Sequence, residues 1–93
     1  MIITVNADSK INYQEEPFGN WLTGTAKTKG TVLNFWLKGF EKPSTFGIGN
    51  GRISKLMLKQ NGRIVYNFDR GLDVAPQTAE AKTVLAMLKE HFN

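Results

Sequence analysis

The chain has 93 residues, of which 41% are hydrophobic and 22% charged, and its 12 Lys and Arg against 8 Asp and Glu give a formal net charge of +4. This composition predicts one soluble globular domain over residues 1–93 with a modest core, rather than a disordered chain. The chain has no cysteine, which excludes disulfides and thiolate chemistry, and no apolar run near the roughly 20 residues that span a bilayer, so we expect no membrane partner.

The first residues, Met-Ile-Ile-Thr-Val, carry neither the basic segment nor the long apolar segment of a secretion signal. We therefore expect a cytoplasmic protein, a setting that also suits a small core without disulfides. The mild positive charge permits a nucleic acid partner but does not require one, because an excess of surface lysine is common in soluble proteins.

The first half of the chain predicts three strands. Residues 1–6 read as a short strand, and the polar segment 8–17 reads as a loop. Residues 18–28 are rich in Thr and contain Trp, which favours a second strand, and a Lys29-Gly30 turn follows. Residues 31–41 alternate between apolar and other side chains and predict a third strand.

The second half adds a hairpin. Residues 42–51 form a long predicted loop that holds a proline and three glycines. Residues 52–60 and 63–69 predict two strands, joined by Asn61-Gly62. This dipeptide is a strong hairpin signal, because both central residues of a type I′ turn need positive φ and Asn and Gly tolerate it.

The last part of the chain predicts one helix. Residues 71–75 turn the chain, and Pro76 suits a first helical turn because its missing N–H costs nothing there. Apolar residues then recur at helical spacing and predict a helix over residues 77–91. The order indicates an α+β fold, in which an antiparallel meander of about five strands carries the C-terminal helix on one face.

Alternation within the strands assigns the two faces of this sheet. The core between sheet and helix is expected to contain Leu33, Phe35, Leu37, Leu56, Leu58, Ile64, Tyr66, Phe68, Val84, Leu85 and Leu88. The opposite face mixes aromatic and basic side chains, and its candidate partner-binding residues are Trp21, Trp36, Lys27, Lys38, Lys55 and Arg63. Such a mixture is unusual for a face that only meets solvent.

Three interpretations of this face stay open. Trp, Met and Arg are enriched at protein interfaces, which favours a protein-interaction module or self-association. Aromatic rings also stack on bases while cations meet phosphates, so single-stranded nucleic acid binding is the alternative. In the third interpretation the sheet curls, and the aromatic side chains form a second small core with the loops.

Residues 46–56 read Phe-Gly-Ile-Gly-Asn-Gly-Arg-Ile-Ser-Lys-Leu and place three glycines in five positions. A phosphate-binding loop needs a helix directly after it, whereas the residues after Gly51 alternate as a strand. The glycines are therefore interpreted first as a sharp structural corner. The candidate loop site consists of Ser44, Gly47, Gly49, Gly51 and Arg52.

Catalytic interpretations find little support. The single histidine, His91, falls two residues before the last residue of the chain, and a surface role suits it better than a general base. Neither Ser44 nor Ser54 has a histidine partner with a plausible placement. We therefore expect a non-enzymatic domain with no cofactor and no metal site.

The carboxylates near the hairpin suggest structure rather than chemistry. Asp69 and Asp73 bracket a turn, where aspartate commonly caps the backbone, and Glu41 is the third acid that could join them. Arg52 shares its alternation with Leu56 and should point toward the helix side. We expect Arg52 to pair there with Asp69 or Asp73.

Two strings carry a family resemblance: PSTFGIGNGRISKL at residues 43–56 and YNFDRGLD at residues 66–73. With them the sequence resembles an uncharacterised family of domains of unknown function from Gram-positive bacteria and their phages and mobile elements. The resemblance runs from the second predicted long strand to the helix. Leu72 departs from it, because the family more often carries Trp at that point. The resemblance implies a domain in a mobile-element setting and no particular chemistry.

Overall fold

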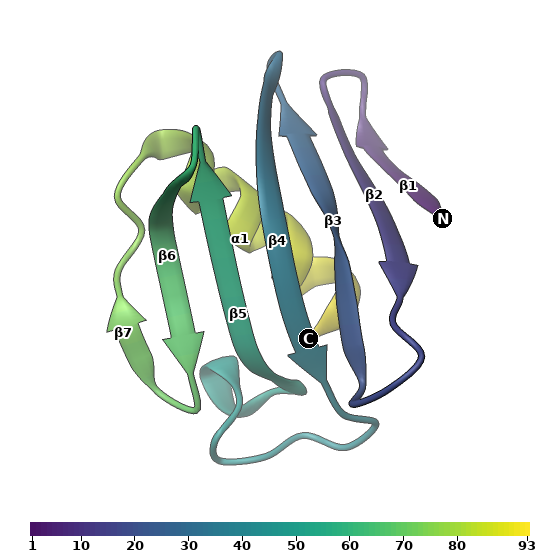
Figure 1. Cartoon of the computed structure of the whole chain (residues 1–93), viewed down its shortest axis with the longest axis vertical. Helices are drawn as coiled ribbons and strands as arrows, with labels where there is room; N and C mark the ends of the chain where they lie inside the picture. The colour runs from purple at the N-terminus through teal and green to yellow at the C-terminus, as the bar shows by residue number, and fades with distance from the viewer.

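The computed structural model describes residues 1–93 and shows one antiparallel sheet with a single helix behind it (Figure 1). The strands are β1 (Ile2–Asn6), β2 (Ser9–Glu15), β3 (Trp21–Thr28), β4 (Thr31–Gly39), β5 (Ile53–Gln60), β6 (Arg63–Asp69) and β7 (Leu72–Val74). A 3₁₀ turn, η1 (Ile48–Asn50), lies between β4 and β5, and the helix α1 (Ala79–Phe92) follows β7. Each strand pairs with the next in chain order, so the sheet is a meander.

The predicted α+β meander with one helix on one face is confirmed, but the number of strands is seven rather than about five. β2 forms within the segment 8–17 predicted as a loop, and β7 within the turn predicted at 71–75. β2 is polar for a strand, yet Ile11 and Tyr13 alternate inward, and neighbours on both sides supply its backbone hydrogen bonds.

Two element boundaries differ from the prediction for local reasons. The segment predicted as a strand from residue 18 becomes extended only at Trp21, because Gly19 and Asn20 have φ of 72° and 59°. The helix begins at Ala79 rather than residue 77, because the Thr78 hydroxyl caps it by accepting a hydrogen bond from the Ala81 N–H at 3.0 Å. α1 is neither long nor apolar enough to cross a membrane.

Most of the predicted core is confirmed. The buried members are Leu33, Phe35, Leu37, Leu56, Leu58, Tyr66, Val84 and Leu88. Phe68 and Leu85 are half-buried and pack against this cluster. The core also contains residues that the prediction omitted, namely Ile11, Ala26, Ile48, Ile53, Val65, Ala81 and Met87.

The prediction was wrong at Ile64, which is 44% exposed, whereas its neighbour Val65 is 3% exposed. The pairing of β5 with β6 explains the exchange, because Leu58 pairs with Tyr66 while Lys59 pairs with Ile64. Val65 is therefore the extra residue of a β-bulge, which shifts the alternation of β6 by one position. Ile64 faces away from the helix and Val65 enters the core.

The helix covers only one side of the sheet. α1 packs across β3, β4 and β5 (Figure 1), and Phe92 near its end meets Tyr13 of β2 edge-to-face, with the ring centroids 5.2 Å apart. No helix or second sheet covers the other side. This uncovered side is called the open face below.

Candidate functional site

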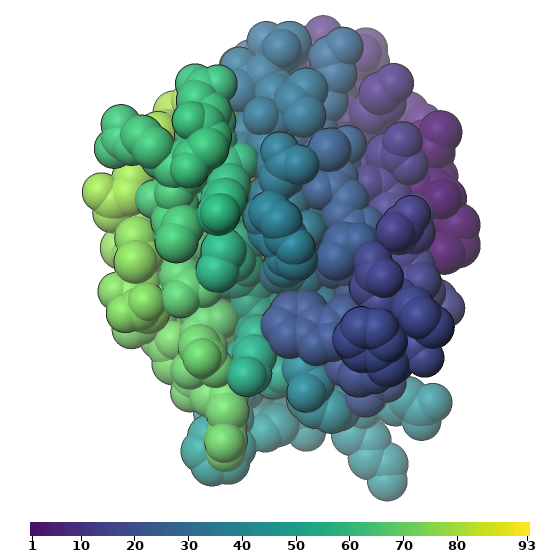
Figure 2. Space-filling model, viewed as in Figure 1, coloured from purple at the N-terminus to yellow at the C-terminus, as the bar shows by residue number.

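The open face is turned toward the viewer in Figure 2, and its two tryptophans lie close together on neighbouring strands. Trp36 of β4 is directly opposite Thr23 of β3, and Trp21 is directly opposite Lys38. The two indole rings are therefore diagonal neighbours across β3 and β4. On its other side Trp36 pairs with Met57 of β5. Trp21, Trp36 and Met57 therefore form a strip of large apolar side chains across three strands, called the apolar strip below.

A hollow of about 680 Å³ lies on this face, with Trp21, Trp36 and Met57 among its lining residues. Glu16 and Phe18 of the β2–β3 connection border it, and that connection stands out from the face in indigo in Figure 2. Across the hollow lie side chains of β5 and β6: Lys55, Lys59, Asn67 and Asp69. The site is thus an apolar strip with charged side chains around it.

Three lysines meet this strip in two different ways. The Lys38 ammonium lies 5.9 Å from the centroid of the Trp21 ring and 5.6 Å from that of Phe40, and the Lys59 ammonium lies 5.6 Å from the centroid of Trp36. Lys55 instead forms the only ion pair of the chain, 3.5 Å from the Asp69 carboxylate. Lys38 and Lys59 therefore keep positive charges that no carboxylate offsets.

Two of the predicted binding residues lie away from Trp21 and Trp36. Lys27 shares the open face but lies at the far end of β3, about 20 Å from Trp21 at the usual rise of a strand. Arg63 pairs with Gln60, whose side chain contacts Thr78 and Glu80 beside the helix. Directly paired residues share a face, so the placement of Arg63 on the open face was wrong.

Lys59, rather than Arg63, is the basic residue that lies beside Trp36. It was omitted from the predicted binding residues, although it alternates with Lys55 and Met57 along one strand. That alternation was the signal that could have identified it.

Glu16 supplies a fixed negative charge at the border of the hollow. Its Oε1 accepts hydrogen bonds from the Thr23 hydroxyl at 2.6 Å and from the Gln14 amide at 3.2 Å. These two hydrogen bonds, Thr23 first, hold the pKa of Glu16 below its ordinary value of 4.5. The hollow therefore presents carboxylates as well as ammonium groups.

Four backbone N–H groups of the glycine loop already donate hydrogen bonds within the loop. The N–H of Phe46 donates to the Ser44 hydroxyl and that of Gly47 to the Ser44 carbonyl, both at 3.0 Å. The N–H groups of Asn50 and Gly51 donate to the carbonyls of Gly47 and Ile48. These four donors are not available to a phosphate, which supports the structural interpretation of this corner.

The side chain of Asn93 completes the corner. Its Nδ2 donates to the Ile48 carbonyl and its Oδ1 accepts from the Ile53 N–H, each at 2.9 Å. A Cβ at Gly51 would overlap with this amide, and one at Gly47 would overlap with the Gly51 carbonyl. These glycines are therefore required by close packing, and Gly49 by its φ of 56°.

Arg52 does not pair with Asp69 or Asp73, so that prediction was wrong. Asp69 pairs with Lys55, and Asp73 accepts a hydrogen bond from Asn67 at 3.0 Å. The pairing of β4 with β5 shifts between Lys55 and Ile53, which leaves Ser54 as the extra residue of a bulge next to Arg52. Arg52 lies at the end of the sheet on the helix side, as predicted, but without an acidic partner.

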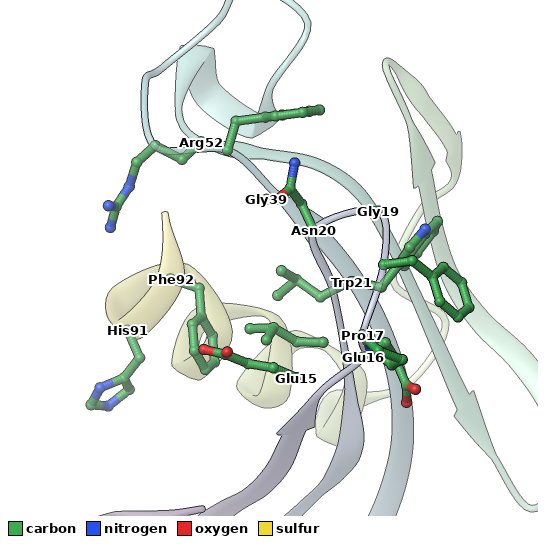
Figure 3. Close-up of a pocket in the computed structure, with 14 residues that line it drawn as sticks. Glu15, Glu16, Pro17, Gly19, Asn20, Trp21, Gly39, Arg52, His91 and Phe92 are labelled. Atoms are coloured by element: carbon green, nitrogen blue, oxygen red, sulfur yellow. The ribbon is translucent and has the colours of Figure 1, made fainter.

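Arg52 borders a second hollow, of about 470 Å³. Figure 3 shows that this hollow extends to the end of α1, where His91 and Phe92 lie. Both Arg52 and His91 are exposed. Elsewhere, no three His, Cys, Asp or Glu side chains of the chain gather closely enough to hold a metal ion.

The two strings of the family resemblance meet in space. The Arg70 guanidinium lies 4.4 Å from the centroid of the Phe46 ring, and the Arg70 N–H donates to the Ser54 carbonyl at 2.9 Å. The ion pair of Lys55 with Asp69 joins the same two strings. The strings thus form one contact region beside the hollow of the open face.

The sequence model of a family described as Domain of unknown function (DUF7678) matches residues 20–93. The match takes in β3 to α1, and it includes every residue that lines the larger hollow except Glu16 and Phe18. No curated protein and no solved structure matches the chain.

Proposed function

The chain belongs to the DUF7678 family, and we propose that it is a non-enzymatic binding domain whose open face receives an acidic segment of a partner protein. The observation that carries the proposal is a hollow lined by Trp21, Trp36 and Met57, whose two indole rings lie beside Lys38 and Lys59, lysines without carboxylate partners. Trp and Met are enriched at protein interfaces, where large side chains fill apolar pockets. An apolar side chain of the partner would enter this hollow.

The charges around the hollow support a choice of occupant. Lys38 and Lys59 carry uncompensated positive charges beside the indole rings, and Asp or Glu side chains of a partner would complement them. Glu16 and Asp69 border the same hollow and would repel a phosphate chain, which carries a charge at every nucleotide, whereas a peptide can place its acidic residues beside Lys38 and Lys59 alone. Mixed charges around an apolar strip therefore favour a protein segment over single-stranded nucleic acid.

The second-core interpretation is less well supported. Trp36 remains 37% exposed and Phe40 44% exposed, and the β2–β3 connection lies against Trp21 alone of these three aromatic residues. The cytoplasmic location and the mobile-element setting belong to the same proposal. The first rests on the absence of cysteine and the second on the resemblance of the two strings.

Intrinsic fluorescence tests the proposal directly, because the only two tryptophans of the chain both line the hollow. The probe is a set of synthetic peptides that contain Asp or Glu and one Leu or Phe, but no Trp. We expect a saturable change in tryptophan emission with at least one of these peptides. Trp36→Ala should weaken that binding by about tenfold or more, as removal of a central interface aromatic does.

Two matched controls separate this site from general surface effects. Val32→Ala changes another exposed apolar residue of β4 on the same face, and it should leave the affinity unchanged. Lys59→Glu should weaken binding, whereas Lys27→Glu makes the same charge change at the far end of the face and should matter much less. Equal loss in both lysine variants would contradict a local site.

Three results would overturn the proposal. The first is that no peptide binds, and the second is that Trp36→Ala binds peptides as tightly as the parent chain. The third is that an oligothymidylate binds instead, with an affinity that falls steeply with salt, as the release of counterions requires. A loss of about 3–5 kcal/mol in the stability of Trp36→Ala would support the second-core interpretation instead.

A further inference from the structure

The strand β1 (Ile2–Asn6) forms an exposed edge of the sheet. It pairs with β2 on one side only, and nothing pairs with its other side (Figure 1). The edge segment, Met-Ile-Ile-Thr-Val-Asn, contains no charged side chain and no proline. Met1 and Ile2 are 61% and 65% exposed. Natural sheets usually protect an edge with charge, proline, a bulge or shortness.

The opposite edge has that protection. β7 is only three residues long, it carries Asp73, and Pro76 follows it closely. Both edge pairings contain a register shift, between Asn67 and Phe68 at β7 and between Thr4 and Asn6 at β1, so this feature does not distinguish the two edges. Because of length, charge and proline, the two edges of the sheet still differ in their capacity to accept another strand, and β1 is the receptive one.

The hydrogen bonds of β1 show which backbone groups are available. Met1 exchanges two bonds with Tyr13, since its amino group donates to the Tyr13 carbonyl at 2.7 Å and its carbonyl accepts from the Tyr13 N–H at 2.8 Å. Along an antiparallel pair of strands every second residue pair is hydrogen-bonded, so Met1 and Ile3 bond to β2 whereas Ile2 and Thr4 do not. The N–H and C=O groups of Ile2 and Thr4 therefore point away from β2.

We propose that two copies of this chain pair through β1, antiparallel and around a twofold axis, into one continuous sheet. The register places Ile2 opposite Thr4 of the second copy and Thr4 opposite its Ile2, which forms four main-chain hydrogen bonds. Ile3 then faces Ile3 of the second copy on the axis, as a pair without direct hydrogen bonds. This part of β1 pairs regularly with β2, because the irregularity in β1 lies beyond Thr4.

A second copy fits this edge better than an unrelated strand, because the segment is self-complementary. Ile3 and Val5 point toward the helix side and are half-buried against the core. In the proposed register each Ile3 packs on its counterpart, so the two cores become continuous. No charged residue of β1 opposes another across the axis.

The pairing leaves the proposed binding hollow accessible. The hollow is lined mainly by β3 to β6, together with Glu16 and Phe18, whereas the axis lies beyond β1 at the sheet edge. Self-association and peptide binding are therefore separate properties, and either can fail while the other holds.

Sedimentation velocity from about 10 µM to about 1 mM tests the pairing, because small interfaces associate in this range of affinity. We expect the parent chain to shift from monomer to dimer with concentration. Thr4→Pro removes only an outward N–H, which an edge strand tolerates, and it should stay monomeric with unchanged circular dichroism. Thr4→Ser keeps the N–H and should dimerise like the parent.

Disulfide trapping tests the register independently, because the chain has no cysteine of its own. Ile3→Cys should form a covalent dimer on mild oxidation, since Cα atoms of such a pair lie about 4.5 Å apart. Thr4→Cys should not form a covalent dimer. The two residues 4 are offset by two positions along the strands, so their Cα atoms lie more than about 7 Å apart. A parent chain that stays monomeric throughout, a Thr4→Pro variant that still dimerises, or more trapping at position 4 than at position 3 overturns the proposal.

Discussion

The side-chain amide of Asn93 lies so close to Gly51 that a methyl group at Gly51 would overlap with it. The amide bridges the Ile48 carbonyl and the Ile53 N–H, and so ties the residue after α1 to both η1 and β5. The glycine-rich corner therefore holds the helix end against the sheet. The glycines at positions 47 and 51 thus meet a packing requirement of the fold.

Gly51→Ala should destabilise the fold, because the new methyl group must displace the Asn93 amide and its two hydrogen bonds. We expect a loss of about 1–3 kcal/mol in the free energy of unfolding, measured by urea denaturation. Gly71→Ala is the matched control. A Cβ at Gly71 meets nothing within 4 Å, so this change should stay within about 0.5 kcal/mol of the parent.

Asn93→Ala should cost a similar amount, about 1–3 kcal/mol, because it leaves the Ile53 N–H and the Ile48 carbonyl without these partners. It also removes the group that a methyl at Gly51 would meet. In a double-mutant cycle, Gly51→Ala should therefore cost less in the Asn93→Ala background than in the parent. Additive losses would show that Gly51 acts through its backbone alone.

Alternation and turn chemistry predicted most of this fold. The Asn61-Gly62 hairpin, the apolar side of β4 and the helix stripe each repeat one local rule over several residues. The prediction failed where partners decide the outcome. β2 is a strand because β1 and β3 pair with it, although its own residues are largely polar.

The candidate site shows the same division. Trp21 and Trp36 were placed correctly, because β3 and β4 pair without a register shift. Arg63 was misplaced, because the bulge at Val65 shifts the alternation of β6 by one residue, and a second bulge, at Ser54, interrupts β5 next to Arg52. Bulges depend on pairing between strands, and nothing in the local sequence marked these two. The contact of Asn93 with the glycine corner spans about half the chain and was equally hidden.

The bulge in β6 predicts opposite responses at adjacent residues. Val65→Ala removes methyl groups from the core and should cost about 1–3 kcal/mol of unfolding free energy. Ile64→Ala removes more atoms, but from a side chain that is largely in solvent, and it should cost less than Val65→Ala. Thermal or urea denaturation measures both. The reverse order would mean that β6 alternates without a bulge.

The helix allows a similar comparison between two leucines. Leu88 is fully buried, whereas Leu85 is only partly buried against the core. Leu88→Ala should therefore cost about 2–5 kcal/mol, the range for a leucine removed from a core, and Leu85→Ala less than Leu88→Ala. Denaturation curves with equal slopes would attribute the difference to packing in the native state.

Thr23→Val should raise the pKa of Glu16, because the Thr23 hydroxyl is the largest cause of its lowered value. NMR titration of the Glu16 carboxyl carbon measures the change, and Gln14→Ala should give a smaller rise in the pKa. When the pKa of a carboxyl group is lower in the folded state than in the unfolded state, the group stabilises the fold at pH values above its unfolded pKa. This stabilisation is lost as the pH falls through the folded pKa. The stability difference between Thr23→Val and the parent should therefore be larger at neutral pH than below the folded pKa of Glu16. A difference independent of pH would attribute the effect of Thr23 to packing alone.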